Sequence, residues 1–243
     1  MNSTLLRAAL VFGVAAFTPM IHAAEVSSHG LVACWHFDET TGTLANDISG
    51  HGHHGTLRGA ARAPGKSGGA VECKQDALIE VPHTAALDEF KDGITVSAWV
   101  KREADSTWNM ILSREVKDGP SEYFGLAVVK NKALFSVDPD GAHYQNIKSA
   151  EDMPAGEWIH LAGTYDNKVF KLYVNGRLAN SAACAVPFQF ADQNPLIIGG
   201  NTNSKGKQWV DCFHGKIDEM LLFNRSLSAK ELLALFKAEP GQP

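Results

Sequence analysis

Short segments in which apolar and polar residues alternate dominate the chain from position 31 onward. The clearest is 94–101, where Ile94, Val96, Ala98 and Val100 fall on one side of an extended chain. Alternation with a period of two places one side of a β-strand against a core. Similar segments lie at 31–37, 70–73, 77–81, 110–114, 123–129, 133–137, 158–165, 169–174, 177–182, 196–199 and 216–223. Many short strands of this kind predict an all-β sandwich or barrel.

Turn and capping residues support this prediction. Asn175-Gly176 supplies the positive φ angles of a tight hairpin turn, and Lys130-Asn131 separates two further strand segments. Only the C-terminus predicts a helix, because Ser228 and Glu231 form a capping box before Leu232 and Leu235. No long linker or repeat divides the chain, so we expect one domain over residues 24–243.

The first 23 residues have the layout of a secretory signal peptide. Arg7 precedes the apolar run 8–17, and small residues at 23–24 mark a cleavage site. The run is too short to span a bilayer, which takes about 20 residues. We therefore expect a cleaved signal peptide at 1–23, a secreted or periplasmic protein, and no membrane insertion after cleavage.

The cysteines and the overall charge refine this picture. The four cysteines (Cys34, Cys73, Cys184 and Cys212) form no CxxC pair, which disfavours a zinc or redox motif. Export would allow disulfide bonds between them, and the alternative is four buried free thiols. The net charge is −5, and no basic run interrupts the sequence, so a nucleic-acid partner is not expected.

Several ordered segments resemble the laminin G-like, concanavalin A-like jelly-roll family of the lectin/glucanase superfamily. They include LVACWHFDE at 31–39, ITVSAWV at 94–100, WIHLAGTYD at 158–166 and LYVNG at 172–176. Further matching segments lie at 46–57, 215–219, 223–225 and 228–231. The resemblance implies two antiparallel sheets packed face to face, with the first and last strands close together and a short C-terminal helix.

The resemblance also implies a range of functions. Many members of the family are non-catalytic carbohydrate-binding modules, and others bind proteins. We expect a lectin-like domain with a glycan or polysaccharide partner. A polysaccharide lyase or glycoside hydrolase on the same fold, and a protein-binding adhesion module of the cell envelope, are the alternatives. No strand carries the Glu-x-Asp-x-Glu pattern of related glycanases, so no catalytic residue is assigned.

Related jelly rolls often hold calcium near the ends of the domain. The candidate ligands here are Asp38 after the first strand, Asp47 in a glycine-rich turn region and Asp218 on the last strand. Carboxylates and backbone carbonyls suit the six to eight oxygen ligands of Ca²⁺. The simpler interpretation is that Asp38 and Asp47 cap turns.

Aromatic residues in polar stretches are the candidates for contact with a sugar. Sugar rings stack on exposed aromatic rings and bond to a few polar groups beside them. The candidates are Trp108, Tyr123, Tyr144 and Trp209, with Arg114 as a cation that could neutralise a uronate. For each aromatic residue the simpler alternative is peripheral packing.

Overall fold

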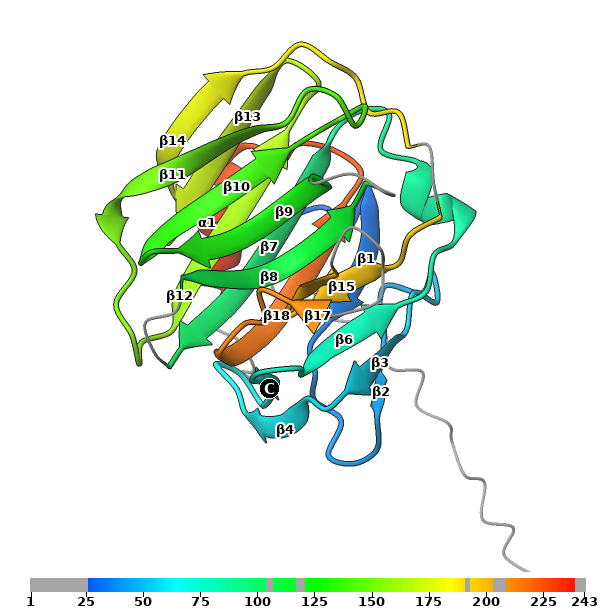
Figure 1. Cartoon of the computed structure of the whole chain (residues 1–243), viewed down its shortest axis with the longest axis vertical. Coiled ribbons are helices and arrows are strands. Elements are labelled where there is room, and N and C mark those ends of the chain that lie inside the picture. The colour runs from blue at the N-terminus through cyan, green and yellow to red at the C-terminus, as the bar shows by residue number, and fades with distance from the viewer. Residues whose placement is uncertain (1–25, 104–106, 117–120, 191–192, 203–208, 239–243) are drawn as a thin grey trace, which may run out of the picture.

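The computed structural model describes residues 26–103, 107–116, 121–190, 193–202 and 209–238 (Figure 1). The predicted signal peptide at 1–23 lies outside these residues. In the described part of the chain, no helix has the length and apolar character needed to cross a membrane.

Two antiparallel sheets pack face to face, which confirms the predicted all-β sandwich (Figure 1). Sheet A runs in the order β14-β13-β12-β7-β18-β5-β4, with β1 paired to β18, and sheet B runs β11-β10-β9-β8-β15-β6-β3-β2. The strands of sheet A are β1 (Leu31–Trp35), β4 (Ala61–Pro64), β5 (Gly69–Cys73), β7 (Ile94–Arg102), β12 (Ile159–Tyr165), β13 (Val169–Val174), β14 (Arg177–Ala183) and β18 (Gly215–Phe223).

The strands of sheet B are β2 (Leu44–Ala45), β3 (Gly55–Arg58), β6 (Leu78–Val81), β8 (Trp108–Glu115), β9 (Glu122–Val129), β10 (Lys132–Val137), β11 (Gln145–Asp152) and β15 (Leu196–Ile198). A separate hairpin pairs β16 (Asn201–Thr202) with β17 (Trp209–Val210) and lies beside β8. A short 3₁₀ helix, η1, spans Ala85–Asp88. The small strands β2, β3 and β4, the hairpin β16–β17 and the polar edge strand β11 were not predicted.

The core fills the space between the sheets. Alternate residues of facing strands meet there, including Trp35 and Leu161 from sheet A and Phe135 and Leu126 from sheet B. The two sheets also meet along one edge, where the Asn180 amide on β14 donates to the Lys148 carbonyl on β11 at 2.8 Å. The edge strands of the two sheets are therefore joined on that side of the sandwich.

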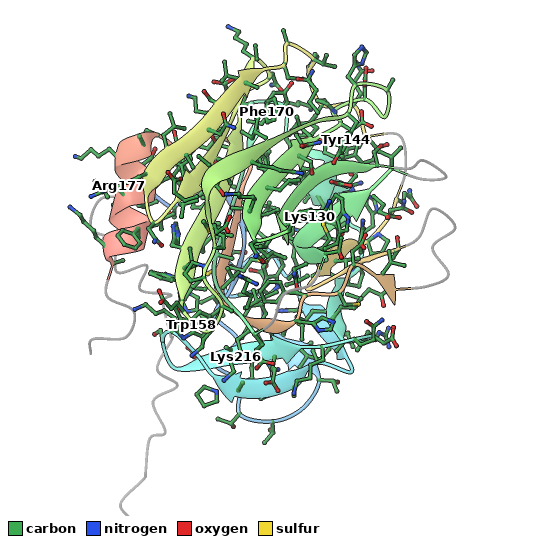
Figure 2. The ribbon with its side chains drawn as sticks, turned by 60° about the vertical axis from the view of Figure 1, so that its left-hand side comes forward. Lys130, Tyr144, Trp158, Phe170, Arg177 and Lys216 are labelled. Carbon is green, nitrogen blue, oxygen red and sulfur yellow. The ribbon has the colours of Figure 1, made fainter. Side chains whose placement is uncertain are left out.

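The C-terminal helix α1 (Ala229–Lys237) covers the outer face of sheet A, as Figure 2 shows beside Arg177. The predicted capping box is present, because Ser228 and Glu231 exchange hydrogen bonds between side chain and backbone. Leu232 and Leu235 pack on Ala162 and Tyr173 of the sheet. Much of the outer face of sheet A is thus occupied by the chain itself.

The turns and the ends of the sandwich also follow the sequence. Asn175 and Gly176 have φ angles of 48° and 70°, and Lys130 and Asn131 have 48° and 66°, so both predicted hairpin turns are confirmed. Strand β1 pairs with β18, which brings the first and last strands together. All four cysteines are buried free thiols, so the predicted disulfides are not confirmed and the alternative of buried thiols describes the structure.

Candidate functional site

Four neighbouring strands, β8 to β11, build one half of the outer face of sheet B. On β8 this face contains Trp108, Met110, Ser113 and Glu115, because a bulge after Met110 keeps these residues on one side. Met110 packs with residues of β9 and β10 in a small buried cluster (Met110, Ala127, Val129 and Leu134). The face therefore has a covered apolar part toward Trp108 and a polar part toward Glu115.

Two carboxylates oppose each other in the polar part. Glu115 ends β8 and Glu122 begins β9, and the two residues are direct partners in the antiparallel ladder. Partners of this kind have Cα atoms about 5 Å apart. The Thr202 hydroxyl donates to Glu115 at 2.5 Å, and the Ser136 hydroxyl donates to Glu122. The sheet thus holds two acidic groups side by side, each with a hydroxyl donor.

Tyr144 stands beside this pair with an open ring. Its side chain is 39% exposed, and its hydroxyl interacts with Ser136, Asn146 and Glu122. The buried carboxylate of Asp138 fixes the chain just before Tyr144. It accepts the His143 N–H at 2.8 Å and the Ser121 hydroxyl at 2.6 Å. Figure 2 shows Tyr144 where the chain enters β11, with Lys130 marking the other end of β10.

Glu115 and Glu122 both have raised pKa values, because they are partly or fully buried and lie close to other acids. Burial, followed by the charges of Glu122 and Asp211, raises the pKa of Glu115 to about 7 against the hydrogen bond from Thr202. Burial also raises the pKa of Glu122, with Asp211 and Asp138 adding to the shift. For Tyr144, burial and then the charge of Glu122 raise the pKa to about 12. The hydroxyl of Tyr144 is therefore a donor at neutral pH.

Trp108 lies at the far end of the same face. It is 38% exposed and begins β8, seven residues from Glu115. At about 3.3 Å per residue, some 23 Å separates Trp108 from the acidic pair. The backbone of Trp209 pairs with that of Thr202, next to Glu115, and its side chain lies outside the description. The exposed rings of Trp108 and Tyr144 thus lie at opposite ends of one elongated face.

Two predicted ligand residues, Tyr123 and Arg114, face the interior of the sandwich instead of an exposed surface. Tyr123 is 1% exposed and packs against Phe190 at 4.9 Å between ring centroids. A bulge between Arg114 and Glu115 leaves Tyr123 without a ladder partner, which turns its ring into the core. Arg114 is also 1% exposed, and its guanidinium bonds to the Leu87 carbonyl at 2.5 Å and to Asp88 at 2.6 Å.

The acidic pair was missed from the sequence for a simple reason. The predicted strands ended at Arg114 and began at Tyr123, one residue short of each glutamate. A search for paired acids on a single strand does not see a pair that lies across two strands. Even with both strands extended by one residue, regular pairing would match Glu115 with Tyr123, and only the bulge brings Glu115 opposite Glu122.

The predicted calcium ligands fall into two separate places. Asp38 accepts the Gly69 N–H at 2.6 Å, and Asp218 accepts the N–H groups of Lys66 and Ser67 at 2.8 and 3.0 Å. Both carboxylates thus bind the loop between β4 and β5. Burial raises the pKa of Asp218 to about 7 against these hydrogen bonds, with the charge of Asp38 adding to the shift.

Asp47 belongs to the other place and organises a turn. Its carboxylate accepts the N–H groups of Cys34, Ser49 and His53, each at 2.9 Å. Burial would raise the pKa of Asp47, but these bonds and the Ser49 hydroxyl hold it below its usual value. The turn-capping alternative therefore describes Asp47. In the described residues, no group of three or more His, Cys, Asp or Glu side chains is arranged to hold a metal ion.

Comparison with known proteins agrees with this architecture. The chain belongs to the concanavalin A-like lectin/glucanase superfamily, whose family model matches residues 74–233. Among curated proteins, it is 23% identical over 177 residues to pappalysin-1 of Mus musculus. That match covers 62% of this chain and 10% of pappalysin-1, so the chain spans a small part of its relative.

Solved structures with the same fold include sugar-binding domains. Domain 4 of AbnA, an extracellular arabinanase of Geobacillus stearothermophilus, was solved with arabinotriose; it is 22% identical, with a TM-score of 0.67 over 85% of this chain and 98% of that domain. The receptor-binding domain of a botulinum neurotoxin C/D mosaic serotype is 14% identical, with a TM-score of 0.68 over 87% of this chain and 52% of that one. These likenesses establish the fold.

Proposed function

We propose that this protein is a non-catalytic glycan-binding domain and that the outer face of sheet B holds the sugar chain. The observation that carries the proposal is the open ring of Tyr144 beside Glu122, Ser136 and Asn146. An open ring offers a stacking surface, and the neighbouring groups match the hydroxyls of a sugar. The arabinotriose complex of the AbnA domain supports a sugar ligand for this fold.

The shape of the face favours a polymer over a short oligosaccharide. Trp108 and Tyr144 are both open but lie at opposite ends, so one ligand that touches both rings must be an extended chain. The predicted signal peptide at 1–23 agrees with an exported protein that meets polysaccharide outside the cytoplasm, and we keep export as part of the proposal.

Affinity for a panel of polysaccharides and oligosaccharides tests the proposal. We expect Tyr144→Ala to weaken binding about tenfold or more, because a ring that anchors a ligand typically contributes over 1.4 kcal/mol. Trp108→Ala should weaken the binding of long chains more than that of short ones. Leu178→Ala is the matched control, since Leu178 is 55% exposed on β14 of the other sheet.

The same panel separates the alternatives predicted from the sequence. Retention of no glycan at all would contradict the proposal and favour a protein-binding module. Shortened oligosaccharides recovered after incubation would show a hydrolase or lyase. Unchanged binding in both the Tyr144 and Trp108 variants would place the sugar elsewhere on the molecule.

Structural calcium stays a prediction; of its three predicted ligands, Asp38 and Asp218 bind the same loop, and Asp47 lies apart from them. Removal of a ligand that binds only the folded protein lowers stability, by about 2.7 kcal/mol when it had been present at a hundred times its Kd. We therefore expect a chelator to lower the melting temperature and added Ca²⁺ to restore it. Asp218→Asn should abolish the response, whereas Asp47→Asn should keep it. A melting temperature indifferent to the chelator would contradict the prediction.

A further inference from the structure

The Tyr144 end of the outer face of sheet B collects negative charge from several elements. Glu115 comes from β8, Glu122 from β9, Asp138 from the segment that follows β10, and Asp211 from the segment that follows β17. The charges of Asp211 and Glu122 act on Glu115, and those of Asp211 and Asp138 act on Glu122. Acids of four elements thus surround the Glu115–Glu122 pair, and Glu122 in turn lies beside the exposed ring of Tyr144.

Two described basic groups on or beside the strands of this face pair with acids other than Glu115 and Glu122. His143 bonds to Asp140 at 2.8 Å, and at the Trp108 end Lys132 bonds to Asp152 at 2.6 Å. Lys148 lies opposite Leu134, two residues beyond Asn146 along β11. Among the described groups, the charges that act most strongly on Glu115 and Glu122 are all acidic. A cation that entered here would relieve the repulsion between these acids.

We propose that the Tyr144 end of this face selects glycans with protonated amino groups, of the kind found in glucosamine polymers, and rejects uronates and sialylated glycans. The inference rests on the proposed glycan binding and names its ligand class. A sugar ring stacked on Tyr144 places its substituents over Glu122 and Glu115, where an ammonium group meets two carboxylates. The tyrosine ring adds a favourable contact, because an ammonium is attracted to an aromatic face. A ligand carboxylate would face only like charges.

The test compares oligomers of equal length whose sugar units are cationic, neutral or anionic. The probes are oligomers of glucosamine, of N-acetylglucosamine and of galacturonic acid, titrated calorimetrically into the full chain at low ionic strength. We expect the glucosamine oligomer to bind about tenfold more tightly than its acetylated form. The galacturonic acid oligomer should not bind measurably.

Isosteric variants assign the preference to the carboxylates. Glu115→Gln and Glu122→Gln should each reduce the tenfold preference to less than about threefold. Glu72→Gln should keep it, because Glu72 lies on β5 of sheet A and pairs with exposed Lys74. Asp211→Asn is a second variant that folding tolerates, since Asp211 is exposed with a φ of 51°, a conformation that asparagine adopts readily. Asp211→Asn should also reduce the preference for the glucosamine oligomer over its acetylated form.

A pH series distinguishes an electrostatic role of Glu115 in binding from a purely structural role. An N-trimethylated glucosamine oligomer keeps its charge at every pH, so only the protein titrates. Because the pKa of Glu115 is about 7, the affinity for this oligomer should rise as the pH rises through neutrality. In Glu115→Gln this rise should be reduced.

The measurements distinguish failure of this inference from failure of the proposed glycan binding. Equal affinity for the amino and acetylated oligomers, or a preference unchanged in both glutamine variants, would overturn this inference while leaving glycan binding intact. Binding of no oligomer or polysaccharide would overturn the proposed function and this inference together.

Discussion

Replacing Gly163 with alanine is expected to destabilise the sandwich by about 2–3 kcal/mol or more. Gly163 lies on β12 of sheet A, and a Cβ built on it would overlap the ring of Phe135 on β10 of sheet B. The glycine allows the close approach of the two sheets at this point. Because cores are packed tightly, neither the ring nor the strand can move away without breaking other contacts. Urea denaturation at equilibrium measures the loss.

A double-mutant cycle shows whether the overlap is the cause. Phe135→Leu alone should destabilise the protein, because it removes part of a buried ring. In the Gly163→Ala background the same change should cost much less or should restore stability, since it makes room for the new methyl group. Strictly additive losses would contradict the proposed contact, as would a Gly163→Ala protein as stable as the parent.

Replacing Arg114 with methionine is expected to cost about 2–3 kcal/mol of stability, because it leaves a buried carbonyl without its donor and removes a hydrogen bond to a carboxylate. The guanidinium holds the Leu87 carbonyl and Asp88 of η1 and lies 4.3 Å from the centroid of the Phe190 ring. A methionine fills the space but leaves these polar partners without their donor. Urea denaturation measures this structural role. Glycan affinity, measured on the same preparations, tests the ligand-binding role that was predicted from the sequence.

Arg58→Met is the matched control for this substitution. Arg58 pairs with Glu80 at 3.1 Å, but its side chain is 54% exposed, and such surface pairs contribute about 0–1 kcal/mol. The folded Arg114→Met protein should keep its affinity for glycans. Retained stability together with lost glycan binding would return Arg114 to the ligand-binding residues.

The sequence predicts the larger strands well because their apolar residues alternate. Segment 94–101, for example, became β7 almost without change, and the capping box at Ser228 marked the helix start. Strand β11 was missed because only Ile147 and Ser149 of its residues are buried, which leaves a mostly polar stretch. An edge strand of this kind is held by its neighbour, and its own pattern does not reveal it.

The candidate site was predicted only in part, and the reason is local backbone geometry. Tyr144 and Trp108 stood out as aromatic residues in polar surroundings, and both are open in the structure. Tyr123 looked similar, but it is the unpaired residue of a bulge, and its ring turns inward. A bulge depends on how two strands pair, so alternation within one strand cannot show it. The pairing of Glu115 with Glu122 was hidden for the same reason.

The central claim is that sugars bind on the outer face of sheet B, and the indole N–H signals of the five tryptophans test it most directly. In a titration of isotope-labelled protein with a polysaccharide fragment long enough to span the face, the Trp108 signal should shift and saturate. The Trp35 signal should stay fixed, because this indole is buried and donates to the His53 carbonyl at 2.9 Å. The variant Trp108→Phe assigns the signal. Saturable glycan binding with an unmoved Trp108 signal, and with full affinity in Tyr144→Ala, would contradict the account.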